Sequence, residues 1–427
     1  MGLIEWFLIA AVFFALISWV SKAIPNSRDR VWLPQIVMWG FAAKAFGALA
    51  RYYMVADLYG GGDSFDYHGR GVAFARIWRS LSVPSFGASG EGTAFTEVVT
   101  GLIYSIYTPS MRGGFLMFAF IAFLGQLLFY AAFRPWLQDK ALKRYALVIM
   151  FFPSIVFWPA SVGKDALMIF FMGLATLGIS RLLRRFELVG LILASLGLYL
   201  TAEIRPHVAM MLALAAALAF VFMKRREGRG RGIKRLIPLA LALIGVIFAW
   251  SAFSADFEVS LEGTTDTQDP AAFLDRVSNQ TAQGGSEVSG GVVTSVTDIP
   301  AATLKVLFRP LIHEGTSLAI LVSSVEGTLL LMVVVWKLPA AWRNRSMIRA
   351  NPLLLLSIMY TGGFVIAFSS MLNLGIIARQ RVQVLPFFLA LLVTLGWPRE
   401  DEDEVKRESR TQQRRKALQP TGRPDSA

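Results

Sequence analysis

The sequence contains no cysteine and only three histidines among its 427 residues. The lack of cysteine excludes disulfide bonds and every zinc or redox site that needs a thiolate ligand. The three histidines, His68, His207 and His313, form no HExxH motif or other metal-site spacing. The first apolar run also lacks a preceding basic segment and a small-residue cleavage site, so we expect it to be retained as a helix.

Acidic residues are scarcer than basic ones, with 29 Asp and Glu against 42 Lys and Arg, a net charge of +13. In a soluble protein this charge would indicate nucleic acid as a partner. Here 55% of the residues are hydrophobic, the mean hydropathy is +0.53, and apolar runs of membrane-spanning length recur. The sequence therefore predicts an all-α polytopic protein of the cell (inner or plasma) membrane, with membrane lipids and no nucleic acid among its partners.

We expect about eleven transmembrane helices and two long outer loops, at 51–110 and 254–316. These form one multi-span domain over residues 1–398, followed by a disordered, basic cytoplasmic tail over 399–427. The expected spans are 3–20, 31–50, 111–133, 145–162, 165–183, 188–204, 206–223, 236–253, 317–336, 352–371 and 382–398.

Lysine and arginine are distributed unevenly between the two sets of loops. With the N-terminus outside and the C-terminus in the cytoplasm, 29 of the 42 basic residues fall in inner loops and 12 in outer ones. Cytoplasmic loops are enriched in Lys and Arg, so this orientation is favoured.

Near the start of the outer loop at 51–110 lies the sequence GGGDSFDYH, residues 60–68. Three glycines allow a sharp turn and close approach to a ligand, and Asp63 and Asp66 could act as bases or hold a divalent cation. The alternative is an Asp/Gly turn that caps a helix over 72–80.

Other charged residues gather at the outer ends of the expected helices. Lys164 and Asp165 follow two prolines and a glycine at membrane depth, where charges usually face a polar cavity. A snorkelling pair at a hairpin tip is the alternative. Arginine binds phosphate through two parallel hydrogen bonds. We therefore expect an anion site on the outer side, which the resemblance described below makes a site for a lipid phosphate, built from His68, Lys164, Asp165, Glu203, Arg205, His207, Arg309, His313, Arg379 and Arg381. For Glu203 to His207, a tight interfacial turn with a local ion pair is an equal alternative.

The acidic, tyrosine-containing first large outer loop (DSFDYH), followed by many spans with broken helices, resembles the GT-C superfamily of polytopic glycosyltransferases. That superfamily includes the protein mannosyltransferase-like and aminoarabinose transferase-like families. The resemblance implies a polyprenyl-phosphate-linked sugar donor and Asp63 or Asp66 as the general base. The chain departs from the pattern by an extra span before the acidic loop, so only this loop is carried over.

A transfer from a lipid phosphate needs a carboxylate to deprotonate the acceptor hydroxyl and cations to stabilise the departing phosphate. We therefore expect a membrane glycosyltransferase of cell-envelope glycan or exopolysaccharide synthesis, with Asp66 preferred as the base. The acceptor would be a glycan, a lipid or a protein. The alternatives are a Wzy-like O-antigen or exopolysaccharide polymerase, and a lipid or polysaccharide transporter.

The orientation leads to a labelling prediction. Single cysteines introduced at Ser89 and Ser286 should react with an impermeant thiol reagent in intact cells, because both lie in expected outer loops. A cysteine at Gly230, in a basic inner loop, should be protected until the membrane is opened. Labelling at Gly230 with protection at Ser286 would reverse the orientation.

Overall fold

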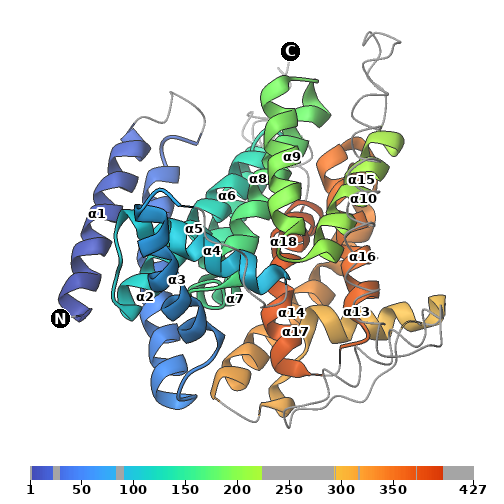
Figure 1. Ribbon diagram of the computed structural model, residues 1–427. Coiled ribbons are helices and arrows are strands. Elements are labelled where there is room, and N and C mark those ends of the chain that lie inside the picture. The colour runs from blue at the N-terminus through green and yellow to red at the C-terminus, as the bar shows by residue number, and fades with distance from the viewer. Residues whose placement is uncertain are drawn as a thin grey trace, which may run out of the picture.

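The computed structural model describes residues 2–22, 29–82, 91–223, 293, 295–315, 318–371 and 373–397, and within these ranges the elements are helices with no β-strand (Figure 1). Five of the helices are long and apolar enough to cross a membrane. They are α1 (Gly2–Lys22), α2 (Leu33–Tyr53) with its π-helical extension η1 (Met54–Leu58), α5 (Met111–Phe133), α8 (Lys164–Arg184) and α14 (Leu318–Arg343). A helical, multi-pass membrane protein is the architecture that this set supports.

Eleven spans are not found in the described part of the chain. A sixth span is obtained if α17 (Leu374–Gln380) with η5 (Arg381–Gln383) is joined to α18 (Leu385–Leu395), across a bend of 67°. The other apolar helices are shorter than a full span: α9 (Leu188–Ala202), α10 (Pro206–Phe222) and α16 (Pro352–Phe368). The expected span 236–253 lies outside the described residues.

The expected span 145–162 is broken by proline. It consists of α6 (Asp139–Phe151), the short α7 (Pro153–Phe157) and an irregular stretch that leads into α8. Pro159 has no N–H, so it cannot bond the Ile155 carbonyl four residues earlier. The Lys44 ammonium of α2 donates to that carbonyl instead, at 2.7 Å, and Lys44 is fully buried.

The loop at 51–110 is largely helical. It contains α3 (Asp63–Arg79) and α4 (Glu91–Ile106), which pack side by side across the bundle (Figure 1). A Cβ atom on Gly71 would lie 2.4 Å from Thr100 Cγ2, so glycine is what permits this close packing. Arg79 donates to the Tyr104 and Ser105 carbonyls in the last turn of α4, where carbonyls lack helical partners. The remaining elements are α13 (Ile299–Phe308), α15 (Ser346–Ala350), η3 (Val296–Asp298) and η4 (Ile312–Glu314).

Helix α8 lies in the middle of the bundle, between α5 and α9, and glycines bring the three backbones close together (Figure 1). A Cβ atom on Gly125 of α5 would lie 2.6 Å from the Ile169 carbonyl oxygen of α8. On the other side of α8, a Cβ atom on Gly178 would lie 2.1 Å from the Ala194 nitrogen of α9. Small residues at helix contacts of this kind are typical of membrane bundles.

This packing predicts that Gly178→Ala lowers the thermal unfolding midpoint of the purified protein, because the new methyl group meets backbone rather than a flexible side chain. Overpacking of this kind costs about 1 to 3 kcal/mol. The control is Gly362→Ala in α16, where a Cβ atom meets nothing within 4 Å. Its midpoint should be unchanged or higher, since alanine favours helix by up to about 1 kcal/mol. Equal midpoints for the two variants would contradict the packing.

Candidate functional site

The acidic loop is the start of helix α3. Gly60, Gly61 and Gly62 have φ values of 67°, 134° and 146°, which other residues rarely adopt, and the helix begins at Asp63 without a side-chain cap. Asp63 and Asp66 are three residues apart and therefore share one face of the first turn. Neither is the N-cap, so the simple Asp-capped turn is not what forms, although both carboxylates favourably face the positive end of the helix.

A second glycine turn starts helix α8. Gly163 has a φ of 143° and is the N-cap of this helix, and it provides no side-chain cap. A Cβ atom at this position would lie 3.0 Å from the Tyr67 ring of α3. The glycine therefore lets the beginning of α8 come against the first turns of α3, which brings Lys164 and Asp165 toward Asp63.

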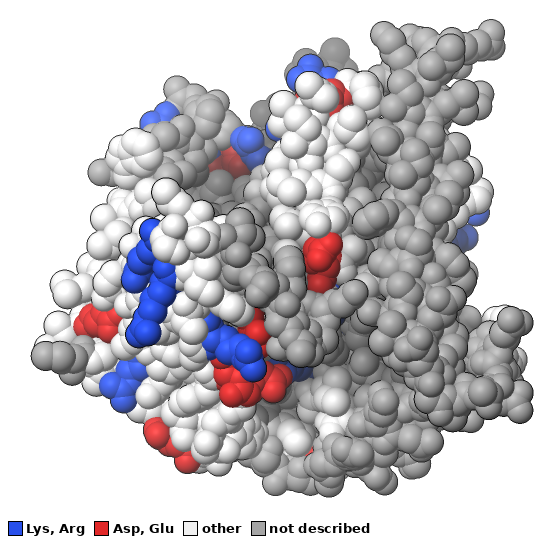
Figure 2. Space-filling model, viewed as in Figure 1, with Lys and Arg blue, Asp and Glu red and all other residues white. Residues whose placement is uncertain are grey.

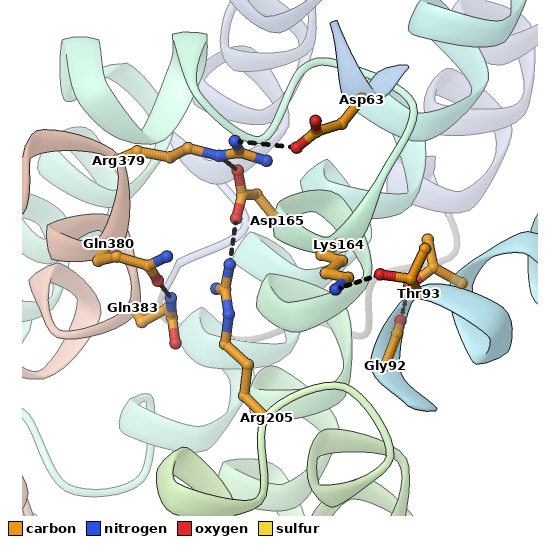
Figure 3. Close-up of polar contacts among 10 residues, drawn as sticks. Asp63, Gly92, Thr93, Lys164, Asp165, Arg205, Arg379, Gln380 and Gln383 are labelled. Carbon is orange, nitrogen blue, oxygen red and sulfur yellow. Dashed lines mark hydrogen bonds and ion pairs between the residues drawn. The ribbon is translucent and has the colours of Figure 1, made fainter. Parts of the chain in front are cut away.

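Asp165 is buried and accepts hydrogen bonds from two arginines (Figure 3). Arg205 Nη2 lies 3.1 Å from one carboxylate oxygen, and Arg379 Nε donates to the other. Arg379 Nη1 also lies 3.8 Å from the exposed Asp63 carboxylate. The contacts thus run from Asp63 of α3 through Arg379 of α17 and Asp165 of α8 to Arg205, the N-cap of α10.

Lys164 joins this group from the other side. Its ammonium donates to Thr93 Oγ1 of α4 at 2.9 Å, and it lies close enough to Arg205, Asp63 and Arg379 to be influenced by their charges (Figure 3). We call Asp63, Lys164, Asp165, Arg205 and Arg379 the charged cluster.

The charged cluster favours an anion. It contains three cationic side chains and two carboxylates, so one positive charge is left over. The helices α3, α8 and α10 all begin at it, and their N-caps, Gly62, Gly163 and Arg205, make no side-chain cap hydrogen bond. Helix N-termini carry partial positive charge and free N–H groups. In addition, Arg205 Nη1 is buried with no hydrogen-bond partner, so donors remain for a ligand.

Arg381 lies elsewhere, although only two residues separate it from Arg379. It is fully buried, and Nη2 donates to Glu326 of α14 at 2.8 Å. Glu326 also accepts from the backbone N–H and the hydroxyl of Ser154, each at 2.6 Å. This network joins α14 and η5 to the broken segment after α6. Arg381 is thus a structural residue in this arrangement.

The other predicted site residues are also dispersed. His207 is packed against Phe368, and Glu203 is the partly buried C-cap residue of α9. Arg309 forms an ion pair with Glu314, while His313 is exposed. Arg309 is thus held in a local pair, whereas Arg205 pairs with Asp165 rather than with Glu203, so the local ion pair considered for the 203–207 turn is not what forms.

His68 and Asp66 lie on α3 but differ in their surroundings. His68 Nδ1 lies 3.0 Å from the Tyr104 hydroxyl, and burial lowers the pKa of His68 against the opposite effect of the Glu5 carboxylate, so the ring is neutral at pH 7. It faces α4 and α5 rather than the cluster. Asp66 is exposed and makes no hydrogen bond or ion pair with a described residue, so its carboxylate is accessible.

The described residues of the site are poorly arranged to bind a metal ion. Within the described ranges, no group of three or more His, Asp or Glu side chains is arranged to hold one. Asp63, which the sequence offered as a cation ligand with Asp66, instead lies beside the Arg379 guanidinium. Thr93 accepts a hydrogen bond from Lys164, and sequence analysis did not identify it as a site residue. A single threonine in an apolar helix carries no distinguishing pattern.

Comparison of the chain with models of protein families, with curated proteins and with solved structures found no match. The functional argument therefore depends on the geometry of the charged cluster. Among the described residues on the face shown in Figure 2, charged side chains gather in separate groups among uncharged surface, as expected for a membrane protein.

We predict that Asp165→Asn destabilises the fold strongly, because it leaves Arg205 and Arg379 close together without their counter-charge. Removing one partner of a buried ion pair costs about 3 to 5 kcal/mol. The matched control is Glu187→Gln, since Glu187 also accepts from two arginines, Arg181 and Arg185, but is only partly buried beside a largely exposed Arg185. Thermal unfolding should show a large drop for the first variant and little change for the second. Equal drops would remove the special role of Asp165.

Proposed function

We propose that this protein is a membrane glycosyltransferase that moves a sugar from a polyprenyl-phosphate donor to an acceptor on the outer side of the membrane. The observation that carries the proposal is the charged cluster. The charged cluster has more cations than carboxylates and keeps an unused hydrogen-bond donor on Arg205. It lies one helical turn from the accessible carboxylate of Asp66. This combination suits a reaction in which a phosphate departs while a hydroxyl loses its proton.

In the proposed reaction the acceptor oxygen attacks the anomeric carbon of the sugar. The bond from that carbon to the phosphate oxygen breaks, and its electron pair leaves with the phosphate. The acceptor proton passes to a carboxylate of α3. Because the donor phosphodiester carries one negative charge and the departing phosphate carries up to two, cations at the phosphate stabilise the transition state more than the ground state.

The carboxylates then have different roles. Asp165 is buried between two guanidinium groups, so it positions Arg205 and Arg379 rather than accepting a proton. Asp63 lies nearest the cations, with its carboxylate 3.8 Å from Arg379 Nη1, so it is engaged by a cation of the cluster. Asp66 has no such partner and lies about 5 to 6 Å further along the same helix face. Asp66 is therefore our preferred base, and Asp63 shapes the phosphate end of the site.

The remaining parts of the proposal come from the membrane setting. Helices α1 and α14 carry exposed large apolar residues, among them Phe7, Val12 and Met332, which suits contact with lipid chains. The donor's polyprenyl chain would lie among the apolar helices, with its phosphate at the charged cluster. The acceptor would be a glycan, a lipid or a protein of the cell envelope.

The proposal predicts that Asp66→Asn abolishes most of the transfer activity while the protein remains folded. Loss of a general base lowers the rate by about 10² to 10⁴. Purified variants in lipid nanodiscs would be incubated with a panel of polyprenyl-phosphate-linked sugars, and the release of polyprenyl phosphate would be measured. Asp63→Asn should also slow the release, because the phosphate end of the site is disturbed.

The control for this experiment is Asp57→Asn, which removes an exposed carboxylate from the η1 segment of the same region. It should release polyprenyl phosphate at the wild-type rate. Full activity of both Asp63→Asn and Asp66→Asn would reject the catalytic role of α3. A wild-type protein that releases no polyprenyl phosphate from any sugar in the panel would argue against the donor class.

A further inference from the structure

Arg51 is a buried guanidinium in the last turn of α2 whose position is set by packing. Lys44, Gly47 and Arg51 lie along one face of α2 at helical spacing. In chain order, each contacts the next part of the broken segment between α6 and α8. Lys44 bonds the Ile155 carbonyl, and a Cβ atom on Gly47 would lie 2.9 Å from Val156. Arg51 comes next and stacks on aromatic rings of the same segment.

The hydrogen-bonding capacity of Arg51 is unused. Its guanidinium lies 5.3 Å from the Phe157 ring centroid and 4.7 Å from that of Trp158, and only 7% of the residue is exposed. It makes no hydrogen bond or ion pair with a described residue, and Nε is buried without a partner. Lys44, on the same face, has a carbonyl acceptor. Cation–π contacts stabilise the charge but satisfy none of the N–H donors.

Arg51 also belongs to the electrostatic neighbourhood of the charged cluster. It lies close enough to Arg379, Asp165 and Asp63 to be influenced by their charges. It is therefore a further cation near the charged cluster, whose five residues already carry one surplus positive charge. The π-helical turn η1 (Met54–Leu58) begins three residues after Arg51. π-helical turns are rare in proteins, and those that occur are often found at functional sites.

A buried guanidinium without a directly paired carboxylate is costly, and a buried charge of this kind in a polar cluster is a candidate for a functional site. We infer that Arg51 is a ligand-binding residue of the charged cluster, which donates hydrogen bonds from its guanidinium to the phosphate group of the ligand. This inference rests on the proposed function for the identity of the ligand as a lipid phosphate. The two aromatic rings hold the planar guanidinium in place for two parallel bonds to phosphate oxygens. Its extra charge matches the second negative charge that a departing phosphate acquires.

The test uses the full-length protein purified in detergent and two measurements on the variant Arg51→Met, which keeps a long apolar side chain. The first measurement is the affinity for geranylgeranyl phosphate, with inorganic phosphate and geranylgeraniol as separate probes. We expect the variant to bind geranylgeranyl phosphate about 10- to 100-fold more weakly than the wild type. Arg79→Met, which removes a guanidinium that caps α4, should leave the affinity unchanged.

The second measurement is the thermal unfolding midpoint without ligand. Arg51→Met should keep or raise the midpoint, because the variant no longer buries an unpaired charge. Arg381→Met should lower it, because Glu326 would lose its partner. Wild-type affinity in Arg51→Met, or a drop in its midpoint as large as that of Arg381→Met, would overturn the inference.

The three probes separate this inference from the proposed function. Binding of geranylgeranyl phosphate that does not depend on Arg51 would reject the role of Arg51 and keep the lipid-phosphate donor. Binding of inorganic phosphate alone, dependent on Arg51, would keep Arg51 as an anion ligand and reject the lipid donor. Binding of geranylgeraniol as tightly as its phosphate would reject both, as would a wild-type protein that binds none of the probes.

Discussion

The Asp165 carboxylate, held between two guanidinium groups, is the interaction on which the candidate site depends. It draws Arg205 and Arg379 to the beginning of α8 from helices that are far apart in the sequence. A lone carboxylate at this depth would be expensive to bury, and so would two unpaired arginines. Together they form a group that the fold can bury and that still carries a positive surplus.

The buried cations of the described residues differ in how far their hydrogen-bond donors are used. Lys44 donates to the Ile155 carbonyl and Arg381 donates to Glu326, and each secures the broken segment between α6 and α8. Arg205 donates to Asp165 through Nη2 but leaves Nη1 without a partner, as Arg381 leaves Nε. Arg51 makes no hydrogen bond with a described residue. The unused donors of Arg51 and Arg205 are within the electrostatic influence of Asp165.

Much of this could be predicted from residue patterns, and the misses have physical causes. Prolines and glycines between 152 and 165 indicate a broken helix, and the structure has one. The separation of Arg379 from Arg381 follows from helix geometry, since residues two apart do not share a face. Sequence reasoning treated the pair as equivalent because it placed them in a loop. Eleven spans were expected because apolar runs of 15 to 17 residues, such as α9 and α16, resemble full spans in composition.

Helix α8 meets backbone on two sides through glycine contacts, at Gly125 and at Gly178. Such contacts leave little room for α8 to move, so Asp165 lies on a closely packed wall of the site. The partners across the site are held differently: Arg379 comes from α17, before a 67° bend, and Asp63 follows three glycines at which an added Cβ atom would meet nothing within 4 Å. We therefore expect a large ligand to displace α17 or the start of α3 rather than α8.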